Sequence, residues 1–182
     1  MIWRSITLVV LLAPAFCSAS FFPDTYDKTF RTQSALWLPG VDWRLLKAQC
    51  WQESRLNPLA VSPVGAQGLC QFMPGTAEEV GRQLGITVSP FAPEWSIQAA
   101  AFYMQRLRRG WSSPRPEVDR HSLAMASYNA GIGNIIKAQK ACDGQLLYSE
   151  IIDCLPDITG RHSKETITYV RNIWRWFMQM VL

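Results

Sequence analysis

The fold is decided by one stretch of the chain, residues 50–77, which reads CWQESRLNPLAVSPVGAQGLCQFMPGTA. It holds one carboxylate, Glu53, and no other acidic residue before Glu78. The prolines and glycines that follow Glu53 predict a loop of fixed turns that can border a cleft, with backbone close to a ligand or to another element. The polar side chains beside them are uncharged hydrogen-bonding groups, a choice that structural turns alone would also explain: Ser54, Asn57, Ser62, Gln67 and Gln71.

Glu53 falls on the apolar face of a predicted helix. We expect this helix to be capped by Asp42 and to end at Ser54, before an Asn-Pro pair. At 100° per residue Glu53 lies about 80° from Leu45, among the apolar positions, and Arg44 lies opposite. Burial raises the pKa of such a carboxyl group, as a general acid requires. A solvated surface glutamate is the alternative, and the lack of a neighbouring cation weakens it.

Helix signals recur along the rest of the chain, and no alternating run long enough for a strand is present. We expect further helices over 77–84 with Thr76 as the cap, over 93–110, from Ser122 to Ala130, over 144–155 and over 164–182. The chain has 182 residues, of which 48% are hydrophobic, and no internal repeat. The sequence therefore predicts a single all-α domain.

The N-terminal segment, residues 1–19, has the layout of an export signal. Arg4 is followed by the apolar run Ile6–Leu12 and by small residues leading to a cleavage point near Ala19. Retention as an inner-membrane anchor is the alternative, because the segment carries no charged side chain after its arginine. In either case the domain over 20–182 is expected outside the cytoplasm, periplasmic or extracellular.

The cysteine count agrees with export. Removing Cys17 with the signal leaves an even number, which suits an oxidising compartment: Cys50, Cys70, Cys142 and Cys154. We expect the pairs 50/70 and 142/154, with four buried free thiols as the alternative. No metal site is expected, because His121 and His162 show no ligand spacing beside these cysteines.

Three motifs carry a resemblance to a known family. ESRLNPLAVSPVGAQGLCQFMPGTA, residues 53–77, is similar to the pattern E-S-x-x-N-P-x-A-x-S-x-x-G-A-x-G-L-x-Q-x-M-P-x-T-A. Downstream, ASYNAGIGNI at 126–135 is similar to A-Y-N-A-G, and ETITYV at 165–170 is similar to E-T-x-x-Y-V. The chain thus resembles, over about residues 40–175, the lytic transglycosylases with an SLT-type catalytic domain, which are related to goose-type lysozymes. It departs from them at Cys70, where methionine is usual, and at Ser127, where alanine is common.

The resemblance implies a lysozyme-like helical fold and a set of site residues. Glu53 is implied as the catalytic acid and then base. The residues implied to contact sugar or support the acid are Ser62, Gln71, Met73, Tyr128 and Asn129. Glu165 is implied to lie near the saccharide, although an acidic residue in the first turn of a helix is an equal alternative.

The same resemblance implies an activity without a cofactor, acting as a monomer on the glycan strands of peptidoglycan. The formal charge of +4 is too small and too scattered to suggest a nucleic-acid partner, and a membrane is a partner only if the N-terminal segment is retained. A catalytically silent wall-binding module would have no reason to keep an acid inside an apolar helix face.

Most glycosidases need two carboxylates, and this loop region offers one. One suffices if the muramoyl 6-hydroxyl is the nucleophile, so that cleavage between N-acetylmuramic acid and N-acetylglucosamine yields a 1,6-anhydro end. The alternative is a hydrolytic muramidase of the goose-type lysozyme kind, in which Glu78, Glu94 or Glu165 would position water.

Overall fold

The computed structural model describes residues 21–87 and 89–182, and within them the chain is helical. The helices are α1 (Asp27–Trp37), α2 (Trp43–Ser54), α3 (Pro74–Leu84), α4 (Pro93–Gly110), α5 (Glu117–Ala130), α6 (Ile132–Ala141), α7 (Tyr148–Ile152), α8 (Leu155–Thr159), a 3₁₀ turn η1 (Gly160–His162) and α9 (Ser163–Val181). Strand pairing among the described residues is limited to two isolated bridges, Val61 with Gln67 and Gln67 with Phe72. The expected all-α class is therefore confirmed. The proposed signal, residues 1–19, lies outside the described residues.

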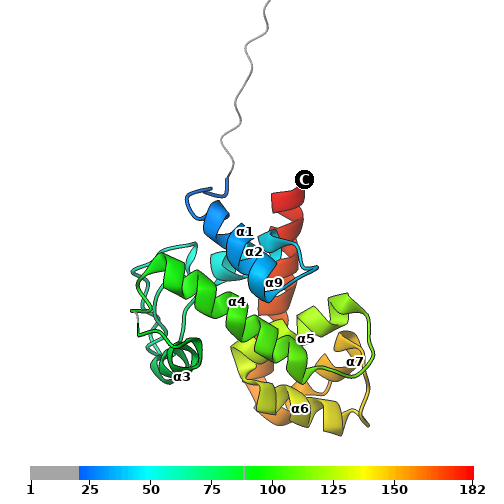
Figure 1. Cartoon of the computed structure of the whole chain (residues 1–182). Helices are drawn as coiled ribbons and strands as arrows, with labels where there is room; N and C mark the ends of the chain where they lie inside the picture. The colour runs from blue at the N-terminus through cyan, green and yellow to red at the C-terminus, as the bar shows by residue number, and fades with distance from the viewer. Residues whose placement is uncertain (1–20, 88) are drawn as a thin grey trace, which may run out of the picture.

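Helix α2 lies at the centre of the molecule. It packs along α9 and also against α1 and α4, while α5 packs on both α4 and α9 (Figure 1). Every residue from Leu45 to Trp51 is buried, including Lys47, whose ammonium group pairs with Asp27 of α1 at 2.5 Å. The buried cation is thus neutralised by its partner, as burial of a charge requires. The end of α2 that carries Glu53 is held from several sides.

The predicted boundaries of α2, α4 and α9 agree with the structure to within two residues. Asp42 caps α2 as expected, its carboxylate accepting from the amide of Arg44 at 2.9 Å. α4 runs from Pro93 to Gly110, and α9 begins at Ser163.

Other predicted boundaries were wrong. Thr76 is not the cap of α3, which begins at Pro74, because proline presets the first helical turn. α5 begins at Glu117, five residues before Ser122. The helix expected over 144–155 forms only at its centre, Tyr148–Ile152, because Gly144 has a φ of 74°, which interrupts helical geometry.

Three helices, α1, α6 and α8, were not predicted. α1 is rich in polar residues and lacks a continuous apolar stripe. α6 begins directly after Gly131, whose φ of 83° ends α5 and turns the chain into the next helix. The disulfide Cys142–Cys154 joins the end of α6 to the start of α8, as the expected pairing required.

No helix in the part of the chain that the structure describes is long and apolar enough to cross a membrane.

Candidate active site

The loop after α2 turns back on itself and is fastened at both ends. Arg55 and Leu56 both adopt left-handed conformations, which end the helix abruptly. The hydroxyl of Ser54 accepts from the amide of Asn57 at 3.0 Å and donates to the carbonyl of Leu69 at 2.6 Å. One serine beside the candidate acid therefore ties the start of the loop to its far end.

The middle of the loop is a set of backbone turns. Ser62 accepts from the amide of Ala66 through its hydroxyl at 2.9 Å, so its side chain stabilises a turn. Gly68 has a φ of 78°, and a Cβ atom there would lie 1.9 Å from the carbonyl oxygen of Pro90. Only glycine fits this position, because both the conformation and the close approach exclude a side chain.

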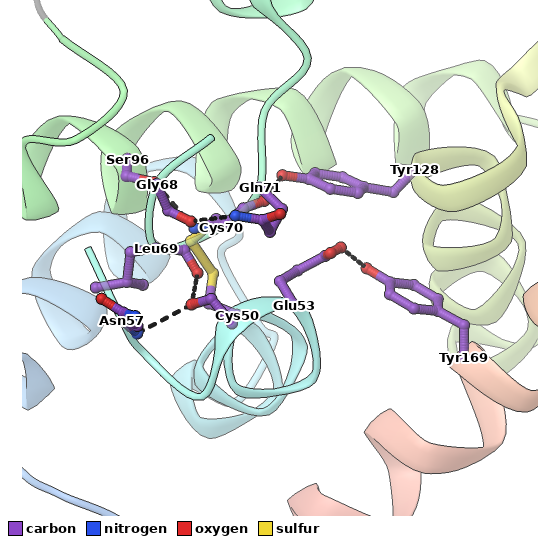
Figure 2. Close-up of a disulfide and its surroundings, with 11 residues drawn as sticks. Cys50, Glu53, Asn57, Gly68, Leu69, Cys70, Gln71, Ser96, Tyr128 and Tyr169 are labelled. Carbon is purple, nitrogen blue, oxygen red and sulfur yellow. Dashed lines mark hydrogen bonds between the residues drawn. A yellow bond between two sulfur atoms is a disulfide. The ribbon is translucent and has the colours of Figure 1, made fainter. Parts of the chain in front are cut away.

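The end of the loop is attached to three helices through Cys70 (Figure 2). Its sulfur forms the expected disulfide with Cys50 of α2. Its amide donates to the hydroxyl of Ser96 on α4 at 3.1 Å, and its carbonyl accepts from the hydroxyl of Tyr128 on α5 at 2.8 Å. The next residue, Gln71, has a φ of 53° and donates its side-chain amide to the carbonyl of Gly68 at 2.9 Å.

Glu53 is largely buried, and its carboxylate meets Tyr169 of α9. The tyrosine hydroxyl donates to Glu53 Oε1 at 2.5 Å, and Figure 2 shows the two side chains pointing toward each other. The pKa of Glu53 is raised from its ordinary value of 4.5 to about 8. Burial is the main cause, the hydrogen bond from Tyr169 acts in the opposite direction, and the negative charge of Glu165 adds to the rise. Glu53 therefore holds a proton at neutral pH.

A second polar group lies where α5 ends and α9 begins. Asn129 accepts from the hydroxyl of Thr166 at 2.7 Å and donates toward Glu165 at 3.4 Å. These three residues border a cavity of about 410 Å³, which His162 and Asn134 also line. On the other side, Gln67 and Glu78 border a cavity of about 550 Å³ beside α3. The first cavity thus borders the polar group of Asn129 and Glu165, and the second borders the loop after α2 and helix α3.

The structure brings together some of the site residues expected from sequence. Tyr128 donates to the carbonyl of Cys70, Gln71 is the next residue in the loop, and Asn129 and Glu165 form the neighbouring group. Ser62 lies within its turn, and Met73 is 45% exposed at the start of α3. The substrate roles of these residues stay predictions.

Sequence reasoning missed Tyr169, the residue in direct contact with Glu53. It is 5% exposed and is the fifth residue of ETITYV, where only the leading glutamate had been singled out. Its place one turn after Glu165 on α9 was the available signal, since residues four apart share a helix face.

A comparison with protein families matches residues 31–147 to the transglycosylase SLT domain. The chain belongs to this family. A relative of the SLT domain, the membrane-bound lytic murein transglycosylase F of Serratia proteamaculans, is 31% identical over 173 residues, which are 87% of this chain and 35% of that protein.

Solved structures agree with the family. The lytic transglycosylase Slt of Pseudomonas aeruginosa, solved as an inactive mutant, has 29% identity and a TM-score of 0.69, and the match covers 86% of this chain and 24% of that one. The 70 kDa soluble lytic transglycosylase of Escherichia coli has 27% identity and a TM-score of 0.70, over 87% of this chain and 24% of that chain. The SLT domain described here spans about a third of the Serratia relative and about a quarter of the solved chains.

Proposed function

We propose that this chain is a peptidoglycan lytic transglycosylase that cleaves the β-1,4 bond between N-acetylmuramic acid and N-acetylglucosamine without consuming water. The observation that carries the proposal is the state of Glu53, a buried carboxyl group with a pKa of about 8, held by Tyr169. Membership of the SLT family and the names of its relatives support the same reaction.

In the first half of the reaction Glu53 acts as a general acid. Its Oε1 accepts the hydrogen bond from Tyr169, so the proton that leaves is carried by Oε2. Transfer of this proton to the glycosidic oxygen lets the bond to C1 of the muramoyl residue break, and the 2-acetamido group of that residue stabilises C1.

In the second half Glu53 acts as a base. Its carboxylate removes the proton of the muramoyl 6-hydroxyl while that oxygen attacks C1, which closes the 1,6-anhydro ring and restores the protonated acid. An intramolecular hydroxyl has an effective concentration of ~10⁵ M or more, so it competes well with water. The hydrogen bond from Tyr169 stabilises the carboxylate during the interval when it is charged.

Hydrolysis by a muramidase is the second candidate function, and one observation supports it. Glu165 lies close enough for its charge to raise the pKa of Glu53, whereas Glu78 and Glu94 are exposed and have no such effect in the described structure. Hydrolysis would require Glu165 to activate water across the sugar ring. Its hydrogen bond with Asn129 instead suits a role in binding saccharide.

We further propose that residues 1–19 direct export and that residues 20–182 act as a monomeric catalytic domain on peptidoglycan glycan strands in the periplasm or outside the cell. Two disulfides within the domain support an oxidising compartment. A retained N-terminal segment would anchor the domain to the inner membrane. Mass determination of the mature N-terminus distinguishes cleavage from retention.

The test of the proposed reaction is digestion of purified peptidoglycan by the full chain, with mass spectrometry of the earliest fragments. We expect muropeptides that end in 1,6-anhydro-N-acetylmuramic acid, each lighter by one water than a hydrolytic product. Early fragments with free reducing ends would contradict this proposal and support hydrolysis by a muramidase. Release of no fragments at all would contradict both.

A further inference from the structure

The disulfide Cys50–Cys70 joins the two parts of the chain that form the candidate site. Cys50 lies on α2 three residues before Glu53, so it belongs to the same helical turn. Cys70 directly precedes Gln71 in the loop, and both cysteines are fully buried. The covalent bond therefore links the helix that carries the acid to the loop segment that faces it (Figure 2).

The loop segment at Cys70 needs such a restraint. Gln71 has a φ of 53°, a left-handed backbone conformation that residues other than glycine seldom adopt. Such a conformation persists where surrounding contacts impose it. The hydrogen bonds from Tyr128 and to Ser96 hold the Cys70 backbone against α5 and α4. The bond to Cys50 is the covalent attachment of this segment to α2.

We propose that the Cys50–Cys70 disulfide is a positioning element for the reaction: it fixes the loop carrying Gln71 and the backbone contact of Tyr128 against the helix that carries Glu53. Its contribution is to geometry and water exclusion at Glu53, in addition to the stability that any disulfide gives. The proposal rests on the proposed function, because it concerns the site that would carry out the cleavage.

The second disulfide provides a matched control within the same chain. Cys142–Cys154 closes a loop with a sequence separation of 12, compared with 20 for Cys50–Cys70. It joins α6 to α8, and Figure 1 shows α6 at the bottom of the view, away from α2. Both bonds constrain the unfolded chain to a similar degree, but only Cys50–Cys70 includes the helix that carries Glu53 and the loop that faces it.

Loss of the Cys50–Cys70 bond has two expected consequences at Glu53. The loop remains tied by Ser54, Ser96 and Tyr128, so the domain still folds, but hydrogen bonds alone then set the separation of loop and helix, which varies over a wider range. A misplacement of 1 Å lowers enzymatic rates by about 10²-fold. Water that enters between loop and helix also reduces the burial that raises the pKa of Glu53, so this pKa falls toward its ordinary value.

The experiment compares the full chain with two double variants, Cys50→Ala/Cys70→Ala and Cys142→Ala/Cys154→Ala. Turnover of a soluble glycan strand is measured against pH, and hydrogen exchange is measured for the amides of residues 68–72. For the first variant we expect kcat to fall by ~10- to 100-fold with KM within about threefold. We also expect the alkaline limb of its pH–rate profile to move ~1 pH unit lower. The control variant should lose stability but keep the kcat and pH profile of the wild type.

If Cys50→Ala/Cys70→Ala does not fold, Cys50→Val/Cys70→Ala replaces most of the lost volume without the covalent bond, and the same losses are expected. Wild-type kcat and pH profile in a folded variant of the first pair would overturn the proposal, and so would equal losses in the control pair.

The hydrogen-exchange measurement distinguishes failure of this inference from failure of the proposed function. A wild type with no activity on peptidoglycan would contradict the proposed function, and exchange at residues 68–72 would then decide the inference. Faster exchange in the first variant than in the control supports positioning by the disulfide. Equal exchange in both overturns it.

Discussion

The hydroxyl of Tyr169 donates a hydrogen bond to Oε1 of Glu53 at 2.5 Å, and the two residues are 116 positions apart in the chain. It joins α9 to the end of α2 at the one carboxylate of the loop region. In the proposed reaction this bond leaves the other carboxyl oxygen to exchange a proton with substrate, and it stabilises the anion that forms after that proton has left. Two helices are thereby needed to build the proposed acid–base group.

Glu53→Gln should fold normally and lose at least ~10²- to 10⁴-fold in peptidoglycan cleavage, because the acid acts in both halves of the reaction. The amide is nearly isosteric and its oxygen can still accept from Tyr169, so the loss reports chemistry rather than packing. Fragment release from purified peptidoglycan, with circular dichroism as the folding control, measures the effect. Retention of a third of the wild-type rate would rule out Glu53 as the acid.

The same substitution should change the pH dependence of stability. The pKa of Glu53 is about 8 in the folded chain and close to 4.5 when unfolded. The folded state therefore binds the proton more tightly, and stability from this group is complete below pH 4.5 and is lost as pH rises through 8. Glu53→Gln has no such loss, so its Tm should exceed that of the wild type at pH 9 by ~3 °C or more. The difference should shrink at pH 4.5, and a constant difference across this range would contradict the raised pKa.

Tyr169→Phe should move the alkaline limb of the pH–rate profile upward. The hydrogen bond from Tyr169 lowers the pKa of Glu53, so its removal raises that pKa and extends the range in which the acid is protonated. The rate at neutral pH should nevertheless fall ~10-fold or more, because the carboxylate formed midway loses its donor. Tyr148→Phe on α7 is the control for loss of a tyrosine hydroxyl elsewhere and should leave both quantities unchanged. A downward shift of the limb in Tyr169→Phe would contradict the assigned role of the bond.

Local signals in the sequence were sufficient for part of this site. Asp42 before a helix, an Asn-Pro pair after it and the apolar neighbours of Glu53 predicted α2 and the partial burial of its acid. The beginning of α5 was missed because its first turn is polar and exposed, and α1 because tertiary packing on α2 and α4 stabilises it more than its own pattern does. The contact of Tyr169 with Glu53 depends on how α9 packs along α2, which no local pattern specifies.

Glu165→Gln separates the two candidate reactions. The charge of Glu165 raises the pKa of Glu53, so its removal should lower that pKa and move the alkaline limb of the pH–rate profile to lower pH. If the muramoyl 6-hydroxyl is the nucleophile, the products should keep their 1,6-anhydro ends, and the main loss should be in KM, because Glu165 borders the cavity shared with Asn129. Glu78→Gln, which alters an exposed carboxylate beside α3, should change neither product nor profile. If Glu165 instead activates water, the wild type should release free reducing ends, and Glu165→Gln should abolish them, since in the described structure Glu165 is the carboxylate whose charge acts on Glu53.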